Sequence, residues 1–352
     1  MKIGILTLYN ADYGSYFQAA SLYRYLEEQG HECWFLNIGS REKYVLKNIV
    51  AGFVADYIPI AAKFIRKKIA PYNTFCTLRS ELSEYRITPL SLSMKKASST
   101  FDCVVLGADE LWSASNPYVR YIPVYYGYHI AAPHISYATS GIGVGTPVPP
   151  VWEEIVANLR TFEAVSVRDL PTQEWVGKIR PVYEHIVLDP TLLHPFFRVT
   201  DEKEEPYIAV YGEHFSQEQV DDICAFAKKN RYAIRAVSWN HTWADEYVQV
   251  SSGMELQRVF AAASYCMVST FHGTAFSIVQ HKPFTAFDTE ARGEKMKRLL
   301  SQLGLEKRLY SGFIAQERID YDKVEEQLAE QRKFSEEYLS GALTKIKKIK
   351  GE

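Results

Sequence analysis

Cysteine is scarce in this sequence and is never paired. The 352 residues include five cysteines, none in a Cys-x-x-Cys arrangement: Cys33, Cys76, Cys103, Cys224 and Cys266. An odd and scattered set argues against a disulfide framework and against a cysteine-based zinc site. Four of the five lie in apolar stretches, where cysteine acts as a small hydrophobic residue. We therefore expect a reducing, cytoplasmic compartment, with no metal site and no cofactor.

The chain also lacks a charge bias and a membrane-spanning run. It has 40 Lys and Arg against 42 Asp and Glu, which disfavours a nucleic-acid partner bound through a broad basic face. The apolar N-terminal run is too short for a secretory signal. Residues 49–65 are apolar but interrupted by Asp56, Pro59 and Lys63, and are too few to cross a membrane. We expect a buried helix there. A helix lying on a membrane surface stays open, because basic residues follow.

Aromatic residues are abundant. They make up 14% of the chain and include 24 tyrosines. A tyrosine ring packs on the apolar face of a sugar while its hydroxyl makes a hydrogen bond, so this composition is typical of carbohydrate-handling proteins. The alternative is that most of these rings fill ordinary half-buried positions.

Strand-like and helical runs alternate along the chain, which is typical of an α/β protein with parallel sheets. We predict two Rossmann-like, doubly wound domains facing a cleft, over residues 1–198 and 205–315, joined by the polar segment 198–206. A helical insertion occupies about 40–100, and a helical segment at 316–352 packs back. The predicted strands are 2–8, 32–37, 102–106, 135–138, 164–167, 186–188, 207–211, 233–238, 265–269 and 283–287. The predicted helices are 16–28, 151–161, 217–230, 255–263, 271–281, 294–303 and 320–350.

Ligands of open α/β sheets bind beyond the carboxyl ends of the strands, so the residues just after strands are the candidates. The loop from Asn10 to Gln18 opens a helix and contains Gly14, so its backbone N–H groups are suited to bind an anion. A purely structural turn is equally compatible with this pattern. The loop is not Gly-x-Gly-x-x-Gly, so the dinucleotide fingerprint is absent.

Two further candidates follow strands of the first domain. Asp109 comes after 102–106 with Trp112 nearby, and an acid beside an aromatic suits a sugar hydroxyl and general-base chemistry. The spacing alone favours the alternative that Asp109 caps a helix. Arg168 leaves the apolar strand 164–167 and is suited to bind a carboxylate or phosphate through its two-pronged guanidinium. The alternative is a salt bridge or a helix start involving Asp169.

His272 is the strongest single candidate in the chain. It follows strand 265–269 and stands at the start of a predicted helix, where the first backbone N–H groups have no partner within the helix. Gly273 permits close approach of a ligand. The position therefore combines an anion site with a side chain that titrates near neutral pH.

Seven motifs, taken in order, resemble the polysaccharide pyruvyl transferase family. The opening NADYGSYFQA (10–19) is similar to the family's N-Y-G…L-Q-A, and FDCVVLGADELW (101–112) to its F-D-x-x-x-x-G-S-D-Q-x-W. The remaining five are ISYATSGIG (135–143), SVRD (166–169), VLDPTLL (187–193), STFHGTAFSI (269–278) and LGLEKR (303–308). Residues 40–100 carry no match. The chain departs from the pattern at Ala108 (Ser in the family), at Glu110 (Gln), and at Lys295, where an Arg is expected. Arg292 and Arg298 are the alternatives to Lys295 for the role of this Arg.

This resemblance implies a fold like that of the GT-B glycosyltransferases and transfer of the pyruvyl unit of phosphoenolpyruvate onto two hydroxyls of one sugar. The acceptor would be a cell-surface polysaccharide or its lipid-linked precursor, and the products a ketal and phosphate. His272 would act as the acid and Asp109 as the base. The first domain would hold the saccharide acceptor and the second the donor. The implied donor-binding residues are Arg168, Gly273, Thr274, Arg292 and Lys295; the implied acceptor-binding residues are Asn10, Tyr13, Gly14, Gln18, Trp112 and Tyr137.

Two other functions stay open. An ordinary GT-B glycosyltransferase would use a nucleotide sugar and grip its ribose through an acidic residue such as Asp288 or Glu290. A non-catalytic carbohydrate-binding protein would keep the fold alone, and the presence of both Arg168 and His272 counts against it. For the transferase, we expect cytoplasmic action at the inner face of the membrane, with peripheral contact through a lipid-linked acceptor.

Overall fold

The computed structural model describes residues 1–9, 12–37, 81–91, 93–113, 121–141, 151–199, 205–288 and 293–351. The predicted apolar stretch 49–65 lies outside the described residues. So do the candidate residues Asn10, Glu290 and Arg292. Of the predicted insertion at 40–100, only residues 81–91 and 93–100 are described.

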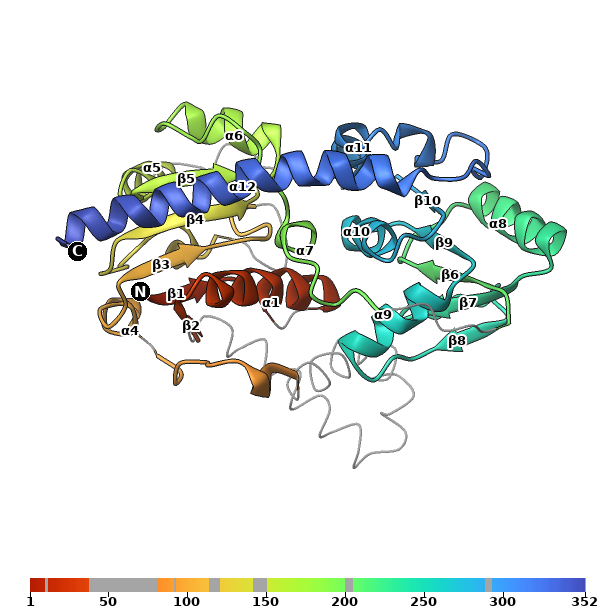
Figure 1. Cartoon of the computed structure of the whole chain (residues 1–352), viewed down its shortest axis with the longest axis horizontal. Coiled ribbons are helices and arrows are strands. Elements are labelled where there is room, and N and C mark those ends of the chain that lie inside the picture. Colours follow the sequence, from red (N-terminus) through yellow and green to blue (C-terminus); the bar gives the residue numbers. More distant parts are fainter. Residues whose placement is uncertain are drawn as a thin grey trace. The chain divides into compact units, whose positions relative to one another are not determined.

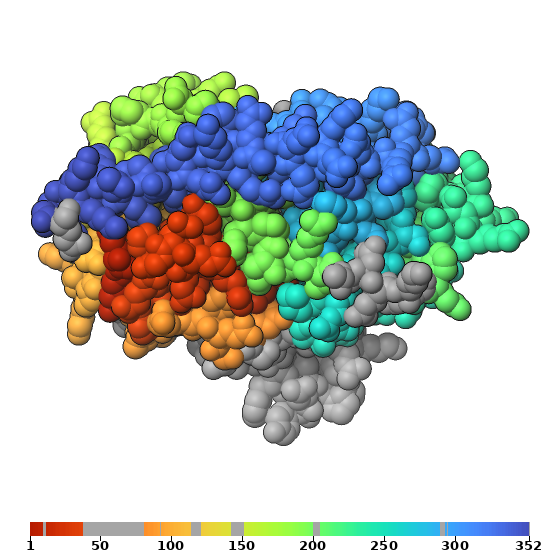
Figure 2. Space-filling view, in the orientation of Figure 1, coloured from red at the N-terminus to blue at the C-terminus, as the bar shows by residue number. Residues whose placement is uncertain are grey.

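The chain divides into two compact units. Unit 1 comprises Met1–His194 and Gln331–Glu352, and unit 2 comprises Pro195–Glu330. The last helix, α12 (Tyr321–Lys350), begins in unit 2 and ends in unit 1. Within unit 1, the C-terminal end of α12 (dark blue in Figure 2) lies against the N-terminal segment (red). The first division falls a few residues before the segment 198–206 that the sequence suggests as a linker.

Unit 1 is built on a five-stranded parallel sheet with the order β2-β1-β3-β4-β5 (Figure 1). Its strands are short and apolar, and β1, β3, β4 and β5 are buried along nearly their whole length, as expected of a parallel sheet covered on both faces. The strands are β1 (Lys2–Leu6), β2 (Glu32–Phe35), β3 (Cys103–Leu106), β4 (His134–Thr139) and β5 (Ala164–Val167). The helices are α1 (Tyr13–Glu28), α4 (Met94–Ser98), α5 (Val151–Leu159), α6 (Leu170–Gly177) and α7 (Pro190–Leu193), with 3₁₀ turns η2 (Leu82–Glu84) and η3 (Pro123–Tyr126).

The order of this sheet reverses between β1 and β3. After β1 the chain passes to β2 on one side, and it then returns to β3 on the other side. Such a reversal leaves a crevice at the carboxyl ends of the two strands, because the connecting segments depart in opposite directions. The segments that follow β1 and β3 therefore define the expected ligand position in unit 1.

The second part of α12 completes unit 1 through specific hydrogen bonds. The Tyr338 hydroxyl donates to the carbonyl oxygen of Ser136 at 2.6 Å, and the Ser335 hydroxyl accepts from the backbone N–H of Leu188 at 2.9 Å. Both helix residues are buried. The end of the chain is thereby fixed to β4 and to the segment that precedes α7.

Unit 2 is built on a second five-stranded parallel sheet, with the order β10-β9-β6-β7-β8. Here the order reverses between β6 and β9, so the expected ligand position lies where these two strands end. The strands are β6 (Tyr207–Tyr211), β7 (Ala233–Val237), β8 (Glu246–Val248), β9 (Tyr265–Val268) and β10 (Phe284–Ala286). The helices are α8 (Gln217–Asn230), α9 (Gly253–Ala262), α10 (Phe271–Val279) and α11 (Gly293–Gln302), with the 3₁₀ turn η4 (Glu306–Arg308) before α12.

The predicted fold class is confirmed, because each unit is a doubly wound α/β structure of the Rossmann-like kind. The predicted strand at 186–188 is wrong. These apolar residues run beside β5 and are buried, but only the bond from Val187 N–H to Val167 O joins the two segments. Tyr137 and Ser335 use the backbone groups of Leu188 instead. No helix in the described part of the chain is both long and apolar enough to cross a membrane.

Candidate functional site

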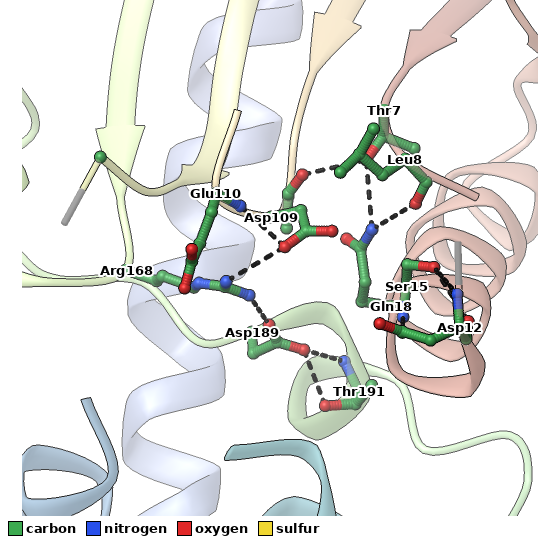
Figure 3. A network of polar contacts seen from close by, with 12 residues as sticks. Thr7, Leu8, Asp12, Ser15, Gln18, Asp109, Glu110, Arg168, Asp189 and Thr191 are labelled. Carbon is green, nitrogen blue, oxygen red and sulfur yellow. Dashed lines mark hydrogen bonds and ion pairs between the residues drawn. The ribbon is translucent and has the colours of Figure 1, made fainter. Parts of the chain in front are cut away.

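A buried arginine lies at the carboxyl edge of the first sheet. Arg168 follows β5 directly, and its side chain is 5% exposed. Its guanidinium forms an ion pair with Asp189 through Nη1, and Nη2 lies 3.6 Å from Oδ1 of Asp109 (Figure 3). Of the two sequence-based interpretations, the internal salt bridge is the one the structure contains. Its partners are Asp189 and Asp109, while Asp169 caps α6.

Asp189 is held rigidly by short-range hydrogen bonds. It is the N-cap of α7, and its Oδ1 accepts from the backbone N–H of Thr191 at 3.0 Å and from the Thr191 hydroxyl at 2.7 Å. Its side chain is completely buried. The Asp-Pro-Thr sequence produces this geometry, since Pro190 is well suited to the first helical turn and Thr191 supplies two donors. Asp189 therefore fixes the position of Arg168.

Arg168 carries the positive charge of this region. Burial alone lowers the pKa of the guanidinium, but the charges of Asp189, Asp109, Glu110 and Asp169 outweigh it and raise the pKa above its ordinary value. Among the described residues, four carboxylates thus act on this one guanidinium.

Asp109 occupies an unusual backbone conformation just after β3. Its φ is +95°, a region that residues other than glycine rarely adopt. Its Oδ1 accepts from the backbone N–H of Glu110 at 2.7 Å, and its carbonyl oxygen accepts from Ser140 N–H at 2.9 Å. Gly107 allows the chain to approach β4 closely, because a Cβ there would lie 2.0 Å from the carbonyl oxygen of Tyr137. The bonds from both sides hold Asp109 at the β1/β3 switch point.

A chain of hydrogen bonds connects this segment to α1. The Thr7 hydroxyl donates to the carbonyl oxygen of Ala108 at 2.9 Å. The amide nitrogen of Gln18 donates to Thr7 Oγ1 at 3.1 Å and to the carbonyl oxygen of Leu8 at 2.9 Å. Gln18 is completely buried. The structure therefore brings Gln18 and Asp109, two of the predicted site residues, to the same switch point (Figure 3).

Two predicted acceptor-binding residues do not face a ligand in this structure. Trp112 is completely buried, and its indole N–H donates to the carbonyl oxygen of Tyr125 at 2.7 Å. Tyr137 is also completely buried, and its hydroxyl donates to Leu188 O at 2.9 Å. The ring of Trp112 packs beside those of Phe162 and Trp175, and the ring of Tyr137 lies beside Tyr338 of α12. The polar groups of both rings are used within unit 1, unlike Oε1 of Gln18, which corrects the expectation that these two rings bind a sugar.

The first turn of α1 holds two further predicted acceptor-binding residues, Tyr13 and Gly14, and both are buried. The turn is capped by Asp12, whose side chain accepts from Ser15 N–H at 2.7 Å, while the Ser15 hydroxyl accepts from Asp12 N–H at 3.0 Å. This capping box satisfies two of the backbone N–H groups that the sequence suggested for binding an anion.

In unit 2, the start of α10 lies at the β6/β9 switch point. Thr270 is the N-cap, and its hydroxyl accepts from Gly273 N–H at 2.9 Å. The backbone N–H groups of Phe271 and His272 are at the first two helical positions, where a helix supplies no partner of its own. His272 is half-buried, and its ring packs beside those of Phe271 and Phe276. This helix start combines aligned dipoles with an imidazole, as the sequence predicts.

The two residues after His272 are buried supports. A Cβ on Gly273 would lie 2.8 Å from Tyr211 Cδ1, so glycine lets α10 approach the end of β6. Thr274 is completely buried, and its hydroxyl donates to Thr270 O at 3.1 Å. Thr274 therefore holds the turn, which corrects the expectation that its side chain binds the donor. Lys295 lies on α11 and is 6% exposed.

His241 also lies at this edge, and no sequence pattern marked it. It follows β7, and its Nε2 donates to the carbonyl oxygen of Gly212 at 2.8 Å. Gly212 comes directly after β6 and leaves no room for a side chain, because a Cβ there would lie 1.9 Å from Ser269 Oγ. His241 therefore joins His272 at the carboxyl edge of the second sheet. In the described part of the chain, no group of three or more His, Cys, Asp or Glu side chains could hold a metal ion.

Comparison with models of protein families shows the family of this chain. The family model described as polysaccharide pyruvyl transferase matches residues 12–290, which include every strand of the two sheets except β1. The chain belongs to the polysaccharide pyruvyl transferase family. The matched range contains Asp109, Arg168, Asp189 and His272. No curated protein matches the sequence.

Several solved structures of distant sequence share similarity over nearly the whole chain. The spinosyn forosaminyltransferase SpnP is 13% identical, with 100% of both chains covered and a TM-score of 0.46. The UDP-GlcNAc 2-epimerase from Methanocaldococcus jannaschii is 9% identical, with 94% of this chain and 92% of that chain covered and a TM-score of 0.46. UGT89C1 from Arabidopsis thaliana complexed with UDP is 9% identical, with coverage of 96% and 94% and a TM-score of 0.44.

Proposed function

We propose that this family member transfers the pyruvyl group of phosphoenolpyruvate to two hydroxyls of one sugar and releases phosphate. The family match over residues 12–290 carries this proposal. The acceptor is a cell-surface polysaccharide or its lipid-linked precursor, modified on the cytoplasmic side of the membrane. Such a reaction needs two sites, one for an anionic donor and one for a polyhydroxyl acceptor. We assign the acceptor to unit 1 and the donor to unit 2.

The donor site is assigned to unit 2. Phosphoenolpyruvate carries a phosphate and a carboxylate, and the first turn of α10 offers backbone N–H groups and the positive end of the helix dipole. Lys295 on α11 is a candidate for neutralising charge, and contacts between α10 and α11 place the two helices together. Arg168 is not assigned to the donor, because its guanidinium is paired with Asp189 and Asp109.

The proposed reaction proceeds by two additions to C2 of the donor. His272 donates a proton to C3, which makes C2 electrophilic, and a sugar hydroxyl attacks C2 while Asp109 takes the hydroxyl proton. The bond between C2 and the phosphate oxygen then breaks, and phosphate leaves with its electron pair. The second hydroxyl attacks C2, loses its proton and closes the ketal. Arg168, held by Asp189, fixes the carboxylate of Asp109 for this role.

The alternative of a nucleotide-sugar glycosyltransferase depends on an acidic residue that grips a ribose. Asp288 follows β10, and its Oδ2 lies 2.8 Å from Nζ of Lys297, while its buried Oδ1 accepts no hydrogen bond from the described residues. Glu290 lies outside the described residues. The family match over residues 12–290 favours the pyruvyl transfer over this alternative.

Phosphate release tests the proposal. We expect the protein to release phosphate from phosphoenolpyruvate when a panel of nitrophenyl and lipid-linked sugars is supplied, with a product of the mass of a pyruvate ketal. The variant His272→Ala should lose this activity by at least about a hundredfold, the low end of what general acid–base catalysis contributes. His185→Ala is the control, since this histidine belongs to unit 1 and its side chain is 40% exposed. Full phosphate release by His272→Ala overturns the assignment.

A further inference from the structure

The amide of Gln18 has a fixed orientation at the β1/β3 switch point. The Thr7 hydroxyl uses its one proton to donate to the carbonyl oxygen of Ala108, so toward Gln18 it can only accept. The carbonyl oxygen of Leu8 is also an acceptor. The group that faces Thr7 and Leu8 must therefore be the Gln18 NH₂. The Oε1 atom consequently points away from them, and this assignment follows from chemistry alone.

Gln18 Oε1 accepts no hydrogen bond from any of the residues that the structure describes, although the side chain is 0% exposed. Leaving a buried oxygen without a donor is costly, so such an atom calls for a partner outside the protein. Figure 3 shows the Gln18 amide and the Asp109 carboxylate pointing toward one another. Two oxygens that only accept hydrogen bonds thus face the same point.

The charges that the described residues place around this point are mostly negative. Four carboxylates, those of Asp109, Glu110, Asp169 and Asp189, act on the guanidinium of Arg168. Asp109 and Glu110 are half-buried, where solvent screens them only in part. A ligand at the switch point of unit 1 therefore meets accepting oxygens and an excess of negative charge.

From this geometry we infer that the site in unit 1 selects an uncharged sugar and rejects an acidic one. A neutral sugar supplies hydroxyl donors to Gln18 Oε1 and Asp109. A uronic acid brings a carboxylate into a region that already contains several, among them the half-buried Glu110 next to Asp109. The inference rests on the proposed function and names the class of its saccharide acceptor. Glu110 acts here as a specificity-determining residue.

Binding in the absence of phosphoenolpyruvate tests the inference. The probes are matched pairs of nitrophenyl glycosides, each a neutral hexoside and the corresponding uronide in the gluco, galacto and manno series. We expect at least one neutral hexoside to bind, and its uronide to bind at least about tenfold more weakly. Higher salt should narrow this gap, since it screens the carboxylates without altering the neutral sugar. Equal or tighter binding of the uronide, or no binding of any neutral hexoside, overturns the inference.

Variants separate the effect of the Glu110 charge from that of the hydrogen bond to Gln18 Oε1. Glu110→Gln should improve uronide binding about fivefold and leave neutral binding unchanged, because one nearby charge is removed. Glu153→Gln, which removes an exposed charge from α5, is the matched control and should change neither. Gln18→Met should weaken neutral binding roughly tenfold and also lower the melting temperature, because Thr7 and Leu8 lose their donor. Unchanged discrimination in Glu110→Gln contradicts the role of this residue.

The outcome also distinguishes this inference from the proposed function. Selective binding of neutral hexosides without phosphate release from phosphoenolpyruvate would support the selectivity and overturn the proposed pyruvyl transfer. Phosphate release with uronides as readily as with neutral hexosides would support the transfer and overturn the selectivity.

Discussion

Arg168 shows how a single buried cation organises a group of acids. Its guanidinium is joined to Asp189, which Thr191 holds from the other side, and it lies 3.6 Å from Asp109. A buried ion pair contributes little net stability, but removal of one partner is costly because the other charge stays uncompensated. The pair is therefore best understood as a device that fixes the position of Asp109.

The first prediction concerns Asp189→Asn. Removal of the carboxylate leaves Arg168 buried without its main partner, so the free energy of unfolding should fall by about 3–5 kcal/mol. Denaturation in urea measures this loss. Phosphate release should fall more than the loss of folded protein explains, because Asp109 is no longer held.

A surface pair supplies the control for this variant. Arg24 and Glu84 lie 3.0 Å apart in the same unit, with side chains 37% and 64% exposed. Glu84→Gln should cost at most about 1 kcal/mol, because water screens such a pair. Equal losses in the two variants would show that burial does not set the strength of the Arg168 pair.

Among the helices, α10 illustrates how a short element positions chemistry. Its N-cap Thr270 binds Gly273 N–H, and Gly273 brings the helix against Tyr211. Both features act on the turn that carries His272. The helix start is thus set by two contacts, one polar and one steric, neither of which touches a ligand.

The second prediction tests this cap. Thr270→Ala should lower the free energy of unfolding by about 1 kcal/mol and phosphate release by roughly tenfold, because the first turn of α10 frays. Thr270→Ser should retain both. Ser252 caps α9 in the same unit, where its hydroxyl accepts from Glu255 N–H. Ser252→Ala should show the same loss of stability with full phosphate release, and equal loss of activity in both alanine variants would refute the role of the cap.

Most of the elements were predictable because their sequences are locally consistent. Apolar runs such as 207–211 and 164–167 gave strands with the bounds expected. The segment 186–188 is equally apolar, and the prediction of a strand there was wrong. An apolar, buried run does not distinguish a strand from an extended segment whose backbone hydrogen bonds go to other partners. Strand β8 was missed, since its three residues are exposed or half-buried and carry no apolar run.

The candidate site was predictable only in part. The places of His272 and Asp109 near strand ends were predictable, because each comes a few residues after an apolar run that forms a strand. Asp189 and His241 were missed because their partners, Arg168 and Gly212, are distant in sequence, and no local pattern records such pairs. Trp112 and Tyr137 were assigned to a ligand because a sequence does not show which aromatic rings other segments cover.

The stability of the whole molecule should fall in acid, and the histidines responsible lie in unit 1. His31, His134 and His194 all belong to unit 1, and burial lowers the pKa of each of them. A lowered pKa means that the unfolded chain binds a proton more readily than the folded unit does. Stability therefore rises with pH through this range and is lost as the pH falls below roughly 6.5.

The third prediction follows from this rise of stability with pH. The free energy of unfolding measured in urea should be smaller at about pH 5.5 than at about pH 7.5, in keeping with the linkage between pKa and stability. His134 is 4% exposed and should account for a large share of the change. His134→Gln should therefore show a shallower dependence on pH. A dependence as steep as that of the unmodified protein would mean that other groups are responsible.

The path of the chain has a consequence for biosynthesis. Unit 2 is one continuous segment, Pro195–Glu330, whereas unit 1 needs Gln331–Glu352 in addition to its first 194 residues. A ribosome therefore completes the second unit before it has made the residues that close the first. Until Ser335 and Tyr338 leave the exit tunnel, Leu188 and Ser136 lack their partners. The nascent first unit must wait for the end of α12, and it is exposed to chaperones and proteases during that interval.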